Sequence, residues 1–159
     1  MSQRPAPPPP PPEPATPRIP WQAVNPPAWL PPVGYANAVV SRGGARVSVA
    51  GQTAMGPDGK LRHAGDLVAQ AGQAFDNVLT VLAAAGARPE HMVRIRIYVR
   101  SADDYATRAG DIGKAWRARF GRWFPAMTRV EVARLYDREA LIEVEAEAVI
   151  PDAGSTGSA

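Results

Sequence analysis

The sequence predicts an α+β domain in which two helices cover one face of a mixed sheet. Short segments that alternate apolar and polar residues open and close the region between residues 33 and 150. Two longer segments with apolar residues at three- and four-residue spacing lie between them, separated by one more alternating segment. The resulting order, ββαβαββ, is typical of a two-layer sandwich with its helices on one sheet face.

The first two strands are predicted over residues 36–41 and 45–50. Arg42, Gly43 and Gly44 lie between them, and a short glycine-rich connection of this kind predicts a hairpin. Gly56-Pro57-Asp58-Gly59 then places a tight turn in the following loop.

The first helix is predicted from the apolar spacing between Leu67 and Ala85. Asp66 is a suitable N-cap because its carboxylate can accept a hydrogen bond from a free backbone N–H of the first turn. Gly86 and Pro89 follow, and both residues end helices.

The remaining elements follow the same two periodicities. Residues 93–99 alternate as a strand, and apolar residues from Tyr105 to Phe120 define a second helix that ends near Gly121. Residues 128–134 and 141–150 complete the domain as two further strands.

Proline is concentrated at the N-terminus of this 159-residue chain. Fourteen of the 18 prolines precede Gly34, so we assign residues 1–32 to a disordered Pro-rich tail, 33–150 to the folded domain and 151–159 to a flexible C-terminal tail. Trp21 and Trp29 are expected to lay the end of the Pro-rich tail onto the domain surface.

Composition excludes several classes of function. The absence of cysteine removes disulfides, thiol nucleophiles and thiolate metal sites, and neither His63 nor His91 has a partner at metal-ligand spacing. No apolar run is long enough for a membrane helix, and residues 1–20 lack the apolar stretch of a signal peptide, so we expect a cytoplasmic protein. The net charge of +3 is scattered along the chain, and we therefore do not expect nucleic acid as the partner.

The second face of the sheet is expected to be unusually charged. We expect Arg94 and Arg96 to balance glutamates across an interface between copies of the chain, which is the alternative to a solvated face. The expected members of this face are Arg94, Arg96, Met127, Arg129, Glu131, Glu143, Glu145 and Glu147.

Five blocks of residues resemble the RidA/YjgF (reactive intermediate deaminase) family in order and spacing. The resemblance spans residues 34–149, nearly the whole predicted domain, and implies a chorismate-mutase-like fold assembled as a homotrimer with ligand clefts between neighbouring subunits. The blocks are Gly34-Tyr35-Ala36-Asn37-Ala38-Val39; Val49-Ala50-Gly51-Gln52-Thr53; Gln70 and Asn77 through Ala85-Gly86; Phe124-Pro125-Ala126 with Val130-Glu131-Val132-Ala133-Arg134-Leu135; and Ile142-Glu143-Val144-Glu145-Ala146.

The resemblance also implies a chemistry. Family deaminases hydrolyse reactive enamines and imines to a keto acid and ammonia, without a metal or cofactor. Carried over by position, Tyr35 would form a wall of the cleft and Gly51 would offer its backbone to the imine. Glu143 would position or activate the attacking water, a role open to a carboxylate beside a cleft.

One position departs from the family pattern. Family deaminases have an arginine two residues after the proline of the Phe-Pro-Ala block, where it binds the substrate carboxylate; this chain has Met127. A thioether cannot replace the planar guanidinium, and the lost charge-assisted hydrogen bond is worth about 1.5–3 kcal/mol. Arg129 lies two residues on and is long enough to substitute, but an ion pair with Glu143 or Glu131 would occupy it instead.

Three functions therefore stay open from the sequence. The first is a trimeric imine or enamine hydrolase with an altered substrate range, using Glu143, Gly51 and Arg129. The second is a non-catalytic member whose cleft binds a small metabolite. The third is an interaction module in which the Pro-rich segment and the second helix, with its basic Arg117 and Arg119, bind protein or nucleic acid.

Overall fold

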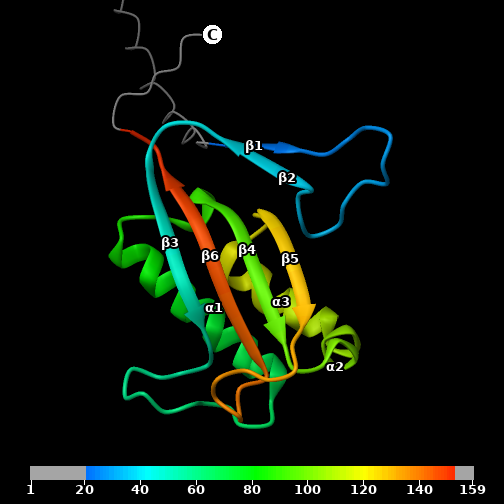
Figure 1. Ribbon diagram of the computed structural model, residues 1–159, viewed down its shortest axis with the longest axis vertical. Coiled ribbons are helices and arrows are strands. Elements are labelled where there is room, and N and C mark those ends of the chain that lie inside the picture. The colour runs from blue at the N-terminus through cyan, green and yellow to red at the C-terminus, as the bar shows by residue number, and fades with distance from the viewer. Residues whose placement is uncertain (1–20, 153–159) are drawn as a thin grey trace, which may run out of the picture.

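The computed structural model describes residues 21–152, and these form a four-stranded sheet with helices on one face and a separate two-stranded ribbon (Figure 1). Residues 1–20 of the expected Pro-rich tail and residues 153–159 of the expected C-terminal tail lie outside the described residues. The elements in chain order are β1 (Trp21–Val24), β2 (Ala38–Ser41), β3 (Ala45–Gln52), α1 (Leu67–Ala84), η1 (Pro89–His91), β4 (Met92–Val99), α2 (Ala102–Thr107), α3 (Ala109–Phe120), β5 (Ala126–Glu131) and β6 (Ile142–Ile150).

The main sheet is mixed, which confirms the predicted class. Its strand order is β3-β6-β4-β5, with β6 antiparallel to both neighbours and β4 parallel to β5. Helices α1 and α3 pack behind it in Figure 1, and the buried side chains between the two layers form the core. The opposite face of the sheet is not covered by any described helix.

Helix α1 has the predicted ends. The Asp66 side chain accepts a hydrogen bond from the backbone N–H of Ala69 at 3.0 Å. The helix ends before Gly86, whose φ of 76° is the left-handed conformation that glycine adopts without steric cost. Between these ends, Phe75, Val78 and Leu82 are fully buried against the sheet.

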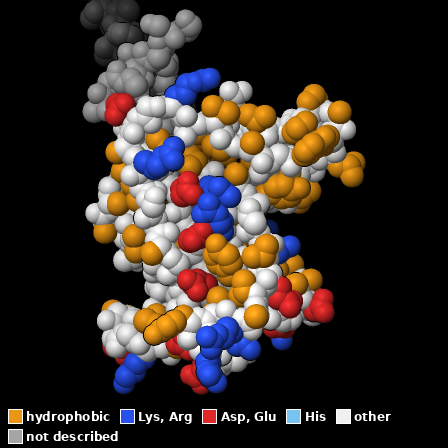
Figure 2. Space-filling view, in the orientation of Figure 1, with side chains coloured by type: hydrophobic (Ala, Val, Ile, Leu, Met, Phe, Trp, Pro, Cys, Tyr) orange, Lys and Arg blue, Asp and Glu red, His pale blue; other side chains and the backbone are white. Residues whose placement is uncertain are grey.

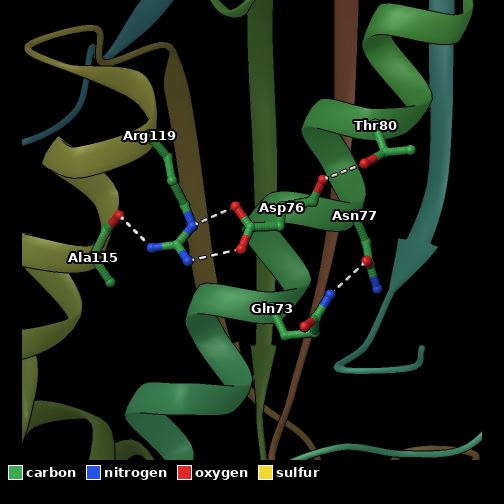
Figure 3. Close-up of polar contacts among 6 residues, drawn as sticks. All are labelled: Gln73, Asp76, Asn77, Thr80, Ala115 and Arg119. Atoms are coloured by element: carbon green, nitrogen blue, oxygen red, sulfur yellow. Dashed lines mark hydrogen bonds and ion pairs between the residues drawn. The ribbon is translucent and has the colours of Figure 1, made fainter. Parts of the chain in front are cut away.

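A bidentate ion pair joins α1 to α3 (Figure 3). The Nε and Nη2 atoms of Arg119 each donate to a different oxygen of Asp76 at 2.7 Å, and Nη1 donates to the Ala115 carbonyl at 3.2 Å. The hydrogen bond that Arg119 donates to Asp76 raises the pKa of Arg119. Helix α1 is therefore fixed to α3 by a polar clamp as well as by apolar packing.

The predicted hairpin between the first two strands is wrong. Strand β2 pairs with β1, whereas β3 pairs with β6. Gly43 and Gly44 both have positive φ, and a Cβ on Gly44 would lie 2.2 Å from the Ile150 carbonyl oxygen. The glycines thus let the chain pass tightly over the end of β6 rather than fold β2 back on β3.

Strand β1 lies within the stretch expected to be an extension, and Trp21 explains why it is ordered. The Trp21 and Trp123 rings meet edge to face with centroids 4.6 Å apart, and the Trp21 indole N–H donates to the Glu90 carbonyl at 3.1 Å. The prediction that Trp21 contacts the domain is confirmed. Trp29 is 63% exposed, so it contributes less to holding this stretch than Trp21 does.

The second predicted helix is divided in two. Ser101 caps α2 by accepting from the Asp104 N–H at 3.1 Å, and the helix axis breaks at Arg108 before α3 begins. Strand β5 also begins two residues earlier than predicted, directly after Pro125.

Candidate functional site

The open face of the sheet bears an ordered charge network. Arg96 on β4 pairs with Glu145 and with Glu147 on β6, and the Tyr98 hydroxyl donates to Glu145 at 3.1 Å. Burial, followed by this hydrogen bond, raises the pKa of Tyr98. Figure 2 shows the acidic and basic side chains interleaved along the middle of this face. Within one chain Arg96 is thus paired with two glutamates, and the expected charge balance between copies stays a prediction.

Two of the predicted site residues meet on this open face. Glu143 lies directly over Gly51, so closely that a Cβ at residue 51 would be 1.8 Å from the Glu143 Oε1 atom. The pairing of β3 with β6 shifts register between Val49 and Gln52, which places Gly51 in a bulge. Bulges recur beside active sites because they redirect the backbone.

The Glu143 carboxylate is available for chemistry. Its side chain is half-buried and forms no ion pair or hydrogen bond with any residue from 21 to 152. Its neighbours along β6, Glu145 and Glu147, are both occupied by Arg96. Of the three glutamates on this strand, Glu143 is the one left to hold a water or a ligand.

Met127, Arg129 and Glu131 were predicted on the open face of the sheet, but they lie on the face that the helices cover. Strand β5 is parallel to β4 with Ile95 beside Met127, Ile97 beside Arg129 and Val99 beside Glu131. Laterally paired residues point to the same side of a sheet, and the three β4 residues are buried under the helices. Assigning Met127, Arg129 and Glu131 to the face of Arg94 and Arg96 was therefore wrong.

Tyr35, Met127 and Arg129 come together at the edge of the sheet. They line a hollow of about 180 Å³ beside β5. The Arg129 guanidinium lies over the ring of Tyr105, 4.4 Å from its centroid, a cation–π contact. The expected ion pair of Arg129 with Glu143 or Glu131 does not form, and the Glu131 carboxylate instead accepts from the Ala102 N–H at 2.8 Å. Arg129 thus retains its hydrogen-bonding groups.

The five predicted site residues form two groups that do not meet within one chain. Glu143 is level with Tyr98 on β4, which in turn is level with Val130 on β5. Two strand spacings separate β6 from β5, about 10 Å, and the two groups face opposite sides of the sheet. Gly51 and Glu143 form one group, and Tyr35, Met127 and Arg129 form the other.

Sequence analysis missed a larger cavity next to the second group. It measures about 490 Å³ and lies between β5, α2 and α3, with Met127 and Arg129 in its wall. Gly113 also lines it. A glycine on the apolar side of an amphipathic helix was the available signal, because it leaves space where a side chain would pack.

The other polar candidates have structural roles. The Asn77 amide donates to the carbonyls of Thr53 and Met55 at 2.9 and 2.8 Å. Buried His91 accepts from the Arg88 N–H at 3.2 Å, and burial lowers the pKa of its imidazole. Over residues 21–152 no three metal-binding side chains gather, and no helix is long and apolar enough to cross a membrane.

Comparison with known proteins agrees with the resemblance seen in the sequence. The family model described as endoribonuclease L-PSP matches residues 28–150. The 2-iminobutanoate/2-iminopropanoate deaminase of Escherichia coli is 38% identical over 84 residues, which are 53% of this chain and 64% of the relative. The chain therefore spans less than two thirds of that enzyme.

Solved structures give the same assignment over more of the chain. The Rid family protein YyfB of Yersinia pestis, of unknown function, has a TM-score of 0.72 and 33% identity, covering 83% of this chain and all of that one. TdcF of E. coli with bound serine has a TM-score of 0.58 and 26% identity, covering 78% and 92%. The chain belongs to the RidA/YjgF family.

Proposed function

We propose that this protein hydrolyses reactive imines and enamines to keto acids and ammonia, in clefts formed between copies of the chain. The observation that supports this most is the free Glu143 carboxylate lying over the Gly51 bulge. An unpaired carboxylate beside exposed backbone can bind both a water and the group that the water attacks. The identity to an E. coli imine deaminase supports the same reaction class.

The reaction needs only proton transfer to and from water. Water adds to the imine carbon while Glu143 accepts one of its protons. Glu143 passes that proton to nitrogen, which gives a carbinolamine. It then transfers the proton of the new hydroxyl to nitrogen as the carbon–nitrogen bond breaks, which releases ammonia and leaves the keto acid. We assign no metal or cofactor to these steps.

Arg129 is proposed to bind the substrate carboxylate in place of the arginine that Met127 replaces. Its guanidinium is held over Tyr105 and has no carboxylate partner among the described residues. It lines the same hollow as Tyr35 and Met127. The move of the positive charge by two residues along β5 is the reason we expect an altered substrate range.

A second copy of the chain is needed to bring Arg129 close to Glu143. Because Glu143 and Arg129 lie on opposite faces within one chain, we propose that Arg129 of one copy approaches Glu143 of the next. A closed ring of three copies satisfies this head-to-tail arrangement, so we propose a homotrimer. We also propose a cytoplasmic location, as expected from the sequence.

The test is hydrolysis of 2-iminobutanoate, generated in situ by a dehydratase. The native protein is compared with Met127→Arg and Glu143→Ala. We expect the native protein to accelerate hydrolysis and Glu143→Ala to lose at least about a hundredfold, because general acid–base groups contribute about 10²–10⁴.

The variants separate the remaining outcomes. If only Met127→Arg is active, the cleft and Glu143 are competent and the natural ligand lacks that carboxylate. If neither native protein nor Met127→Arg is active, the hydrolase proposal is wrong. A non-catalytic metabolite-binding protein then remains, which the missing arginine at Met127 favours.

A further inference from the structure

The cavity beneath β5 has the dimensions of a ligand pocket. Its volume of about 490 Å³ falls within the range of about 300–1,000 Å³ typical of small-molecule sites. Its inner wall consists of Phe75, Ile97, Ile112 and Trp116, all of which are at most 5% exposed. The interior of the cavity is therefore apolar.

The aromatic walls are held in place by their neighbours. The Trp116 ring meets Phe75 edge to face at 5.4 Å and lies parallel to Phe124 at 6.1 Å. The Trp116 indole N–H donates to the Trp123 carbonyl at 3.1 Å, which fixes the orientation of the ring. A cavity between walls fixed in this way stays open instead of collapsing.

The mouth of the cavity is basic and adjoins the proposed site. Arg129 and Met127 line both the cavity and the hollow at Tyr35, so the two spaces share a wall. Arg117 and Arg122 also line the cavity, and within residues 21–152 neither guanidinium forms an ion pair. An apolar interior with guanidinium groups at its mouth fits a molecule with a bulky apolar end and a carboxylate.

Met127 contributes to the same fit. Where a family deaminase would have a charged side chain, this chain places a flexible thioether that packs well against aromatic groups. The exchange removes a charge from the cavity wall while Arg129 keeps one at the mouth.

We infer that the substrate is the imine of an aromatic amino acid, with its ring in this cavity and its carboxylate at Arg129. This inference rests on the proposed function. It predicts that the kcat/KM for the imine of phenylalanine exceeds that for 2-iminopropanoate by at least about tenfold, as expected for a filled apolar pocket.

Gly113 allows the cavity to be filled without disturbing the fold. A Cβ at this position would meet only the flexible end of Arg117, at 3.4 Å. Gly113→Leu should therefore be tolerated by α3, and leucine is a better helix former than glycine. Gly110→Leu is the matched control, because Gly110 lies in the same helix, faces open space and does not line the cavity. Gly113→Ala supplies an intermediate filling.

The experiment compares both imines, produced by an amino-acid oxidase, with the native protein and these variants. Gly113→Leu should lower the ratio of the two kcat/KM values by at least about tenfold, with a smaller decrease for Gly113→Ala. Gly110→Leu should keep the native ratio. A native ratio near one, or an unchanged ratio in Gly113→Leu, overturns the inference. The mass of each assembly is measured as well, since a changed mass in Gly113→Leu means that a second copy fills the cavity, which also overturns it.

Binding separates this inference from the hydrolase proposal. The keto acids phenylpyruvate and pyruvate are titrated calorimetrically into the native protein, Gly113→Leu and Gly110→Leu. Phenylpyruvate binding at least about tenfold tighter than pyruvate, and lost only in Gly113→Leu, supports the cavity assignment even if no imine is hydrolysed. Equal binding of the two acids, or no binding of either, refutes the cavity assignment whatever the kinetics show.

Discussion

The contact between Gly51 and Glu143 yields the sharpest test of the site. In Gly51→Ala the new methyl carbon would start 1.8 Å from the Glu143 Oε1 atom and 2.8 Å from its carboxyl carbon. Real contacts to a Cβ are essentially never shorter than 3.0 Å, so the carboxylate must move by more than about 1 Å. Displacing a catalytic group by that distance costs about a hundredfold in rate.

Stability should change little in the same variant. Gly51 does not have a positive φ, and the atoms that must move are at the far end of a half-buried side chain. We expect a change in unfolding free energy below about 1 kcal/mol, equivalent to a Tm shift of no more than about 4 °C.

The assay is 2-iminobutanoate hydrolysis, with thermal unfolding measured on the same samples. Glu143→Ala and the double variant with Gly51→Ala are included, and the double variant should be no slower than Glu143→Ala alone, because both changes act through one carboxylate. Full activity in Gly51→Ala, with the fold intact, would refute the proposed role of Glu143.

Two further predictions concern the fold. Arg119→Ala and Asp76→Ala should each lower the unfolding free energy, measured by urea denaturation, by about 1 kcal/mol. A double-mutant cycle should give a coupling energy of similar size. Additive effects would show that the ion pair in Figure 3 contributes nothing to stability. His91 should destabilise the fold as the pH falls through about 6.5, because burial lowers its pKa and the unfolded chain then binds the additional proton. His91→Gln cannot lose stability in this way. Between pH 7.5 and 5.5 the unfolding free energy of the native protein should therefore fall more than that of His91→Gln. An equal fall in the two proteins would contradict the reasoning.

Periodicity predicted the helix whose ends depend on neighbouring residues and the two strands at the centre of the sheet. Helix α1 has its cap at Asp66 and its end before Gly86 because capping depends on neighbouring residues. Strands β4 and β6 also formed where their alternation indicated. The family blocks identified the fold, since their order and spacing extend through most of the domain.

The sequence was less informative about strand pairing and about sheet faces, because both depend on residues far away in the chain. Strand β2 pairs with Trp21–Val24, and two positive-φ glycines signal a tight turn without specifying which strands pair across it. On β5, alternation shows that Met127 and Arg129 share a face but not which one. The charge of Arg129 suggested the open face, yet Arg129 lies on the helix side, over the ring of Tyr105, and stays exposed to solvent.

The site residues could be named but not placed. Tyr35, Gly51, Met127 and Glu143 were assigned by position from the family resemblance, and Arg129 because it lies two residues after Met127. That they form two groups on opposite faces depends on the strand order β3-β6-β4-β5, which no local pattern encodes.

The most direct measurement mixes two variants to test whether one site takes residues from two copies. Glu143→Ala and Arg129→Ala proteins, each inactive toward 2-iminobutanoate, are unfolded together in equal amounts and refolded. If Glu143 of one copy works with Arg129 of the next, roughly a quarter of the sites in random trimers keep both residues, and activity returns to that fraction of the native rate. A mixture as inactive as its parents, under conditions in which the native protein refolds to full activity, would contradict the shared site.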